Sequence, residues 1–319
     1  MADMSRDKLI TVFGGSGFVG RHVVRALARD GWRIRVAVRH PNLALFLRPM
    51  GRVGQIQLLK CDVKNEAQVR AALEGADACV NLVGVLVSGG EQNFTALHWD
   101  TADRIARAAH DLGVARLVHV SALGVSAEAP ASYFRTKAAG EAAVQAAFPQ
   151  ATILRPAVVF GPEDDFFNRF GALARLSPVL PLIGGGATRF QPVFVGDVAL
   201  AVAAIVNDPA TAGRVFEAAG PEIFTFKELL HIVLRETRRK RLLVPLPFSL
   251  AMLKGFFLGL LPNPPLTMDQ VRMLHTDTVA SPKGLGLAAL GIAPRALEAI
   301  VPSYLWRFRR AGQFEPASS

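Results

Sequence analysis

The feature that most constrains this chain is a glycine motif near its start, between a strand pattern and a helix pattern. Leu9–Phe13 is apolar, and it runs directly into Gly14-Gly15-Ser16-Gly17-Phe18-Val19-Gly20 before a helical pattern. Glycines at this spacing allow a tight turn, close backbone approach to a diphosphate, and close packing of helix on strand. The helix N-terminus adds amide donors for the phosphates. The motif therefore predicts a dinucleotide site, with a plain glycine turn as the alternative.

The first half of the chain alternates short strand patterns with helical patterns. The expected strands are Leu9–Phe13, Ile34–Val38, Ile56–Leu59, Ala78–Val83, Leu117–Val120 and Ala151–Leu154. The expected helices are Val19–Arg29, Glu66–Leu73, Phe94–Leu112 and Ser132–Ala147. Parallel strands need crossover helices, so this alternation predicts an α/β fold with a Rossmann-type doubly wound parallel sheet. The rhythm breaks after residue 156. We therefore expect a dinucleotide-binding domain over 1–160 and a smaller C-terminal α/β region over 161–319.

The end of the second expected strand bears on which dinucleotide is bound. A site for a ribose 2′-hydroxyl would place Asp or Glu there, but the sequence places Arg39. A guanidinium can pair with a 2′-phosphate, which favours NADP(H) over NAD(H), unless Arg39 is only a surface residue. Asp62 and Val63 follow the third strand, where an adenine ring would lie, and Asp62 is also a candidate helix N-cap. Asn81 and Gly84 end the fourth strand, beside the expected cofactor path.

Three further residues form a candidate catalytic set. Tyr133 and Lys137 lie four residues apart on one expected helical face, and Ser121 ends the fifth expected strand. An ammonium group near a phenol lowers the pKa of the phenol. Lys137 is therefore expected to lower the pKa of Tyr133 and to hold the nicotinamide ribose, while Ser121 orients a substrate carbonyl. The alternative is an ordinary helix face.

The basic charge is concentrated in one segment. The chain has a net charge of +10, and residues 235–310 contain 12 Lys/Arg against 4 Asp/Glu. A dense basic run at 235–241 precedes the apolar stretch Leu246–Leu261, which is shorter than the ~20 residues that a spanning helix needs. An aromatic and basic segment follows at Tyr304, Trp306, Arg307, Phe308, Arg309 and Arg310. These segments predict either a surface that lies on an anionic membrane or a core helix with solvated cations beside it.

Other classes find little support in the sequence. No zinc-finger, RNA-binding or basic-zipper pattern favours nucleic acid, and the spacing of the histidines and cysteines suggests no metal site. His98 and His110 are expected on helix faces, and Cys61 and Cys79 are expected as buried thiols. The polar start before Leu9 leaves no room for a signal or transit peptide.

Taken together, these motifs resemble an extended or atypical short-chain dehydrogenase/reductase. The glycine motif, Asn81, Ser121, Tyr133 and Lys137 are in register with that superfamily. Later segments also resemble its landmarks: Leu154-Arg155-Pro156, Phe160-Gly161-Pro162 and the stretch Val193–Ala199.

A narrower resemblance covers about residues 8 to 302. It rests on short motifs: Leu47–Gly51 with Gly54-Gln55, Glu163-Asp164 with Asn168-Arg169-Phe170, Gln191-Pro192-Val193 and Arg272-Met273-Leu274-His275. These motifs are similar to those of the nucleotide-binding accessory subunit of respiratory complex I (NADH:ubiquinone oxidoreductase) and its bacterial relatives. The resemblance implies tight, structural binding of NADPH and a place where the hydrophilic arm meets the membrane arm. Tyr133 and Lys137 would then be inherited site residues.

Because no presequence is seen, a bacterial relative is expected, peripheral to the cytoplasmic face of the inner membrane; a mitochondrial member would face the matrix. Two other functions fit the same residues. One is a free NADP(H)-dependent reductase, sugar-nucleotide epimerase or dehydratase that uses Ser121, Tyr133 and Lys137. The other is a regulatory module that reports NADPH occupancy to a partner.

Overall fold

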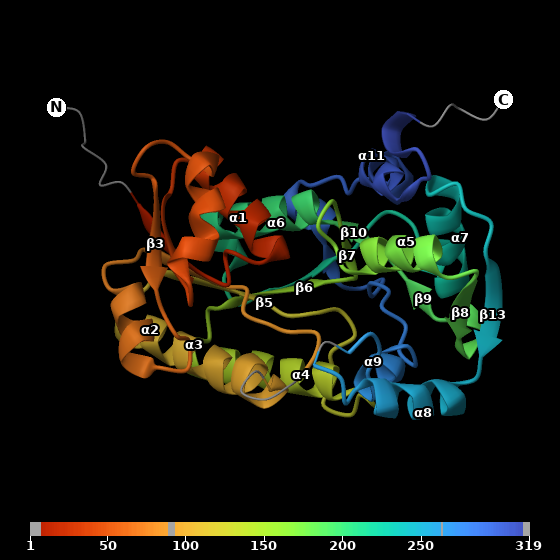
Figure 1. Ribbon diagram of the computed structural model, residues 1–319. Coiled ribbons are helices and arrows are strands. Elements are labelled where there is room, and N and C mark those ends of the chain that lie inside the picture. Colours follow the sequence, from red (N-terminus) through yellow and green to blue (C-terminus); the bar gives the residue numbers. More distant parts are fainter. Residues whose placement is uncertain (1–7, 89–92, 263, 315–319) are drawn as a thin grey trace.

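The computed structural model describes residues 8–88, 93–262 and 264–314. At its centre lies a parallel sheet of eight strands in the order β14-β11-β6-β5-β4-β1-β2-β3 (Figure 1). The strands are β1 (Leu9–Phe13), β2 (Arg33–Val38), β3 (Ile56–Lys60), β4 (Ala78–Asn81), β5 (Arg116–Val120), β6 (Thr152–Pro156), β11 (Val215–Ala218) and β14 (Leu285–Gly286). The strand order reverses between β1 and β4, which is where ligands bind in sheets of this kind.

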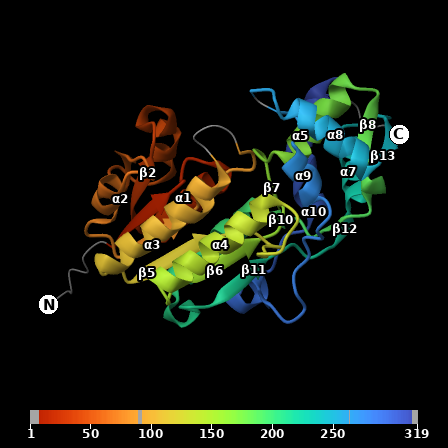
Figure 2. The ribbon, with the colours of Figure 1, turned by 90° about the horizontal axis from the view of Figure 1, so that it is seen from below.

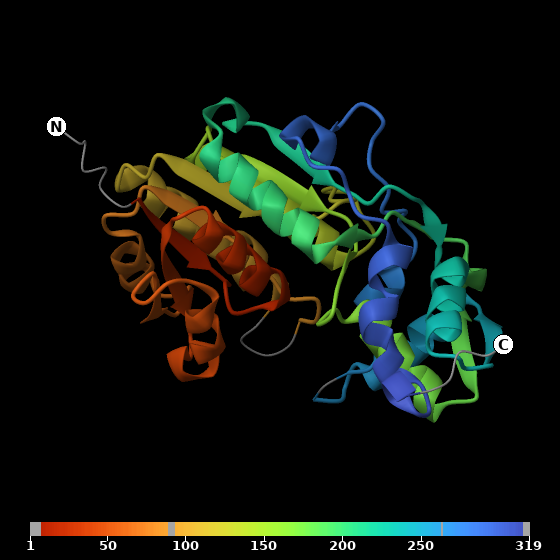
Figure 3. The same cartoon turned by 90° about the horizontal axis from the view of Figure 1, so that it is seen from above.

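Helices cover both faces of the sheet. One face carries α1 (Phe18–Arg29) and α6 (Val195–Asn207), which pack against each other (Figure 3). The opposite face carries α2 (Glu66–Leu73), α3 (Thr101–Asp111) and α4 (Ser132–Ala147) (Figure 2). Successive strand side chains point to opposite faces, so Val12 enters the core under α1 and Phe13 enters the core under α3. The predicted Rossmann-type fold is confirmed.

The predicted elements correspond closely to the observed ones, with three corrections. The strand expected to reach Val83 ends at Asn81, whose side chain bonds to the turn that follows. The helix expected over Phe94–Leu112 begins as a π-helix, η2 (Thr95–Asp100), and continues as α3. Asn65 caps α2, and not Asp62, because the Asn65 side chain accepts from the Gln68 amide at 3.1 Å.

The sheet does not end where the first half of the chain ends. Beyond residue 160, the chain returns to add α6, β11 and β14 to the sheet. The break in sequence rhythm after residue 156 therefore marks an excursion into a second lobe, and the chain afterwards rejoins the sheet (Figure 1).

The second lobe, here called the C-terminal lobe, is built on a core rich in phenylalanine, including Phe160, Phe167, Phe190 and Phe226. Its strand pairs are β7 (Val159–Phe160) with β10 (Val193–Phe194), β9 (Arg189–Phe190) with β12 (Phe224–Thr225), and β8 (Val179–Ile183) with β13 (Leu242–Leu246). Its helices are α5 (Phe166–Leu176), α7 (Phe226–Glu236), α8 (Phe248–Leu258), α9 (Met268–Met273), α10 (Leu297–Ile300) and α11 (Pro302–Leu305). Short helical turns complete the chain: η1 (Pro41–Met50), η3 (Gly184–Gly186), η4 (Pro209–Thr211), η5 (Leu287–Leu290), η6 (Trp306–Phe308) and η7 (Gly312–Phe314).

Two of the short motifs behind the narrower resemblance hold this lobe together. The buried Asp164 carboxylate accepts from the Phe167 amide at 2.6 Å and from the Tyr304 hydroxyl at 2.7 Å. Gln191 joins two distant segments, because its amide donates to the Gly220 carbonyl at 2.7 Å and accepts from the Ala280 amide at 3.0 Å. These motif residues are structural in this fold.

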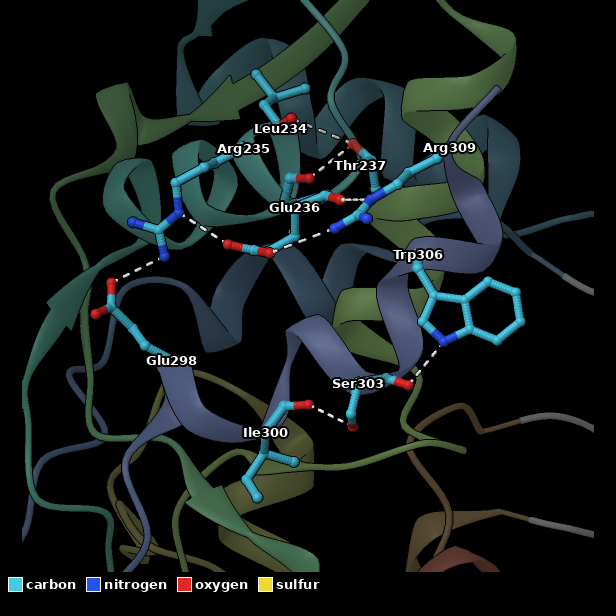
Figure 4. A network of polar contacts seen from close by, with 10 residues as sticks. Leu234, Arg235, Glu236, Thr237, Glu298, Ile300, Ser303, Trp306 and Arg309 are labelled. Atoms are coloured by element: carbon cyan, nitrogen blue, oxygen red, sulfur yellow. Dashed lines mark hydrogen bonds and ion pairs between the residues drawn. The ribbon is translucent and has the colours of Figure 1, made fainter. Parts of the chain in front are cut away.

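The aromatic and basic segment at 304–310 is attached to the C-terminal lobe by polar contacts, and part of it remains exposed. Tyr304 is buried on Asp164, and the Arg309 side chain donates to the Glu236 carbonyl at 2.8 Å (Figure 4). A buried carboxylate needs hydrogen-bond partners, and this segment supplies one of them. Trp306 and Arg310 are among its exposed side chains.

The apolar stretch at 246–261 instead forms the end of β13 and the helix α8. Phe257 is 61 % exposed and Leu260 is 74 % exposed, and four more large apolar side chains of this region are also exposed: Leu250, Leu253, Phe256 and Leu261. Within the described ranges, no helix combines the length and the apolar composition that crossing a membrane requires.

Candidate nucleotide site

The glycine motif forms the turn between β1 and α1. Gly14 has φ of +78°, a left-handed conformation that glycine adopts without strain. A Cβ atom on Gly20 would lie 2.3 Å from the Gly14 carbonyl oxygen, so only glycine allows the helix to approach the turn this closely. A Cβ on Gly17 would meet only that same oxygen, at 3.4 Å. The backbone here thus leaves the room that a diphosphate needs.

The N-terminus of α1 is open to a ligand. Gly17 caps the helix without a side-chain hydrogen bond, so the first amides of α1 have no side-chain acceptor at the cap. Ser16, Phe18 and Val19 lie in the same turn and first helical residues. These amides and the positive end of the helix dipole suit phosphate oxygens, so the turn fits a dinucleotide.

The remaining predicted cofactor residues lie at the carboxyl ends of neighbouring strands. Arg39 follows β2 directly and is exposed. Asp62 and Val63 follow β3; Asp62 is exposed and Val63 is buried. The Asp62 carboxylate accepts from the Lys64 amide at 3.0 Å, which shapes the turn after the strand. Because parallel strands end on one edge, these residues lie on the same edge as the glycine turn.

Asn81, on the other side of the switch point, is tied to a buried histidine. Its side-chain oxygen accepts from the Val83 amide at 3.0 Å, which orients the side-chain amide so that Nδ2 donates to His119 Nδ1 at 3.1 Å. His119 is therefore neutral with its proton on Nε2, and that atom is buried without a protein partner. Burial, the Lys137 charge and His98 lower the pKa of His119 to about 3.

Lys137 is a buried cation on the adjacent helix α4. It is 4 % exposed, and its ammonium donates to the Val120 carbonyl at 3.1 Å. A Cβ on Gly84 would lie 3.2 Å from Nζ, so the loop after β4 passes directly over this group. Burial lowers the pKa of Lys137 to about 8, against a smaller raising effect of Glu141. The structure thus brings Lys137 and Gly84 together as neighbours.

Tyr133 packs among aromatic rings. Its ring lies edge-on to His98 at 5.3 Å, to Phe134 at 5.4 Å and to Phe94 at 6.0 Å between centroids. Burial raises the pKa of Tyr133 to about 12. We expected Lys137 to lower this pKa, and that expectation is wrong for this geometry because desolvation of the phenol dominates.

His98 belongs to the same group, and the helix face on which it lies is buried. It is 1 % exposed, because η2 turns it inward between Phe94 and Tyr133. The Val85 amide donates to Nε2 at 3.1 Å, so Nδ1 carries the proton and donates to the Thr136 hydroxyl at 3.0 Å. Burial and the Lys137 charge lower the pKa of His98 to about 3.

The N-terminus of α4 is capped from the C-terminal lobe. Ala131 provides no side-chain cap, and the carboxylate of Asp269 on α9 accepts from the Ser132 amide at 2.7 Å and the Tyr133 amide at 3.0 Å. A carboxylate at this end also stabilises the helix dipole. The sequence offers no local sign of this cap, because the partners lie 136 and 137 residues apart.

Ser121 follows β5 directly and is buried, and its hydroxyl has no hydrogen-bond partner in the protein. A buried hydroxyl without a partner at the carboxyl edge of the sheet suits a group that bonds to a ligand. Cys61 and Cys79 are buried thiols as predicted, and burial raises the pKa of both, that of Cys61 to about 11. Within the described residues, no group of His, Cys, Asp and Glu gathers as metal ligands would.

The fold and the site define a class. A doubly wound sheet with a glycine turn at its switch point is a Rossmann-type fold, the fold of NAD(P)-binding proteins. A family model described as NAD(P)H-binding matches residues 14–168. The chain is similar in structure to an Escherichia coli NADPH-dependent quinone oxidoreductase, with a TM-score of 0.74 at 20 % identity, covering 93 % of this chain and 99 % of the other.

Sequence relatives identify the family. The chain is 36 % identical over 314 residues to the mitochondrial NADH dehydrogenase [ubiquinone] 1 alpha subcomplex subunit 9 of Arabidopsis thaliana, covering 95 % of this chain and 78 % of the relative. It is also 30 % identical over 239 residues to a ceramide reductase of Caulobacter vibrioides, covering 75 % of this chain and 74 % of the relative. The chain belongs to the family of alpha subcomplex subunit 9 proteins of respiratory complex I.

Proposed function

We propose that this protein is an accessory subunit of respiratory complex I that binds NADP(H) as a structural cofactor at the membrane junction. The observation that carries the proposal is the similarity to subunit 9 proteins over 95 % of the chain, together with an intact glycine turn. The same similarity makes a role in the assembly of the complex a variant of this proposal.

The residues on the carboxyl edge support NADP(H) over NAD(H). The turn Gly14–Gly20 would hold the diphosphate, and Arg39 would pair with the 2′-phosphate. Asp62 and Val63 would flank the adenine, and Asn81 and Gly84 would line the path to the nicotinamide. When bound, the nicotinamide would supply hydride-transfer chemistry.

The state of Tyr133 disfavours turnover that needs Tyr133 as a general base. With a pKa raised to about 12, the phenol keeps its proton at neutral pH and is a poor general base. Lys137, buried beside Gly84, would donate hydrogen bonds to a ribose without changing its charge during a reaction.

The exposed apolar side of α8 supports docking at a membrane. Six large apolar side chains at 250–261 face solvent in a segment that also carries net positive charge. Such a surface suits the boundary between headgroups and acyl chains of an anionic membrane. In a bacterium this would be the cytoplasmic face of the inner membrane, and in a mitochondrion the matrix side.

Native purification tests the proposal most directly. Gentle solubilisation of source membranes, isolation of the protein, and mass spectrometry should recover complex I subunits and bound NADP(H). Recovery of the protein alone from the soluble fraction, without other complex I subunits, would count against membership of the complex. Recovery of NAD(H) in place of NADP(H) would count against the cofactor assignment only.

A free reductase or epimerase is the second candidate, favoured by the unpartnered Ser121 hydroxyl and by the similarity to a ceramide reductase. Ser121 would orient a substrate carbonyl, Tyr133 would hold or deliver the proton, and Lys137 would anchor the ribose. Tyr133→Phe should then abolish NADPH oxidation over a panel of carbonyl substrates while NADPH binding is retained. Equal turnover in wild type and variant would exclude this role for Tyr133.

A further inference from the structure

A pocket of about 700 Å³ lies at the amino edge of the sheet, opposite the edge that carries the glycine turn. Leu9, Arg33 and Ile56, the first residues of β1, β2 and β3, all line it. Most of the other lining residues come from the loop between η1 and β3, and they are Ile34, Arg48, Pro49, Gly51, Arg52, Val53, Gly54, Gln55 and Gln57. A volume of this size is typical of binding sites, and the pocket is here called the arginine pocket.

The charge of the arginine pocket is positive and unbalanced. Three arginines line it, and none of its lining residues is acidic. Arg33, Arg48 and Arg52 are exposed, and their side chains form no hydrogen bond or ion pair with the part of the chain that the structure describes. The Asp77 carboxylate lies close by, but it accepts from the Leu9 amide at 2.8 Å. The pocket therefore presents concentrated positive charge to an approaching anionic group.

The loop that carries two of these arginines is held in shape by Gln55. Its Nε2 donates to the Ala28 carbonyl at 2.7 Å and to the Trp32 carbonyl at 3.0 Å, and its Oε1 accepts from the Arg52 amide at 2.8 Å. A Cβ on Gly51 would lie 2.7 Å from that same oxygen, so glycine lets the loop close on the glutamine. The first of the short motifs behind the narrower resemblance thus shapes this pocket. A loop fixed in advance loses little conformational entropy when a partner binds.

The surroundings of the pocket suit a protein better than a small anion. Val53, next to Arg52 in the loop, is fully exposed, and Leu43 is 77 % exposed on η1. Exposed apolar side chains beside arginines are typical of surfaces that bind proteins. β3 and α8 lie at opposite ends of the molecule (Figure 1), so the pocket is separate from the proposed membrane surface.

The strand that begins at the pocket has a free edge. β3 is an outer strand of the sheet, and within the described ranges no strand pairs with its other side. The Gln55 carbonyl accepts from the Ile34 amide at 2.8 Å, and alternate residues continue this ladder with β2. The residues between them turn their backbone groups away from β2, and these are Ile56, Leu58 and Lys60. A free edge of this kind can pair with an extended chain.

We propose that the arginine pocket and the free edge of β3 together bind an extended acidic segment of a partner protein. The segment would add to β3 as a further strand, and its Asp or Glu carboxylates would pair with Arg48 and Arg52. This inference goes beyond the proposed function and does not depend on it, because it uses neither the nucleotide site nor α8.

Photo-cross-linking of the full chain in the source cells tests the proposal and finds the partner. Val53 and Gln57, which are exposed and line the pocket, are replaced one at a time by p-benzoylphenylalanine, and the cross-linked peptides are sequenced by mass spectrometry. Leu176, 78 % exposed at the end of α5, is the matched control position. Both pocket positions should cross-link to one segment rich in Asp and Glu, and Leu176 should not reach that segment.

That segment, made as a labelled peptide, is then titrated with full-chain variants by fluorescence anisotropy. Arg48→Gln with Arg52→Gln should lower the affinity about tenfold, because each exposed ion pair contributes up to about fivefold. Arg175→Gln with Arg214→Gln removes two exposed charges far from the pocket and should change the affinity less than about twofold. Lys60→Pro removes a backbone donor from the free edge and should bind about fivefold more weakly than Lys60→Gln. The melting temperature is measured on every variant.

Several results would overturn the inference. A cross-link to lipid or to a segment without acidic residues would do so, as would no cross-link at either pocket position. An equal loss of affinity in the control pair would mean diffuse charge and no site. Equal affinities of Lys60→Pro and Lys60→Gln would mean that no strand is added to β3. Co-purification of complex I subunits tests the proposed function separately, because a partner outside complex I would leave this inference intact.

Discussion

In the nucleotide-binding half of the molecule, Lys137 is buried between a backbone carbonyl and two neutral histidines, whereas in the C-terminal lobe Lys240 and Arg310 are exposed beside apolar side chains. Burial lowers the pKa of Lys137 to about 8, because the charged form is costly to bury. The exposed cations pay little desolvation cost for their charge, and they attract anions that approach the surface. Basic side chains are thus enclosed beside the proposed nucleotide site in one region and exposed near the proposed docking surface in the other.

The largest effect that would test the enclosed site is expected at Gly20. Gly20→Ala places a Cβ 2.3 Å from the Gly14 carbonyl oxygen, so the turn must open. We expect the free energy of unfolding to fall by about 3 kcal/mol, with no measurable NADPH binding. Denaturant unfolding and calorimetric titration measure the two effects. Gly17→Ala, with a Cβ contact of 3.4 Å, should keep its stability and lose only nucleotide affinity.

The next largest effect concerns the exposed surface. Leu253→Asp with Phe257→Asp should lower binding to anionic vesicles by at least about 100-fold, because each large apolar side chain buried in lipid contributes about 1.5–3 kcal/mol. Stability should be unchanged, since both side chains are 54–61 % exposed. Vesicle flotation and thermal unfolding measure this. Leu43→Asp with Leu45→Asp, exposed on η1, is the matched control, and an equal loss there would contradict a specific surface on α8.

Removal of the Arg39 side chain is expected to lower the affinity for NADPH about 30-fold. Removing the guanidinium in Arg39→Ala deletes charge-assisted hydrogen bonds to a 2′-phosphate, worth about 2 kcal/mol. NADPH affinity should fall while NADH affinity stays constant, as fluorescence titration would measure. Arg33→Ala, at the opposite end of β2, should change neither. If NADH already binds wild type as tightly as NADPH, the preference for NADP(H) is wrong.

The buried histidines predict a pH dependence of stability. His119 has a folded pKa of about 3 against an ordinary 6.5, so the unfolded chain binds the extra proton first as the pH falls. The contribution of neutral His119 to the free energy of unfolding is fully present above pH 6.5. It is lost between pH 6.5 and 3, at up to about 1.4 kcal/mol per pH unit. His119→Phe should flatten this slope in denaturant unfolding at several pH values. His110→Gln, at an exposed position, should leave the slope unchanged.

The smallest expected effect tests the link between the two regions. Asp269→Ala removes the cap on α4 and should lower the free energy of unfolding by about 1 kcal/mol. Asp165→Ala is the control, because Asp165 begins α5 without a side-chain cap hydrogen bond. If both variants lose equal stability, α9 does not contribute to holding the helix that carries Tyr133 and Lys137.

Much of the nucleotide-binding half could be predicted because its signals are local. Strand and helix periodicity, and the glycine spacing, depend on near neighbours in the chain, and β1, α2 and α4 have the predicted bounds. His98, His119 and Asp269 could not be assigned to the site in this way. His98 lies in η2, a π-helix that the sequence pattern did not predict, and the partners of Asp269 lie more than 130 residues away.

By itself, the sequence determined the class of fold, the glycine turn and the positive charge of the segment 235–310, since each depends on residue order and type. Tertiary structure alone decided where that charge and the polar groups lie. It buried Tyr304 on Asp164, brought Arg310 to the end of α7, and raised the pKa of Tyr133. Burial and contact between distant segments set these properties, because desolvation depends on what packs around a group and not on its neighbours in the chain.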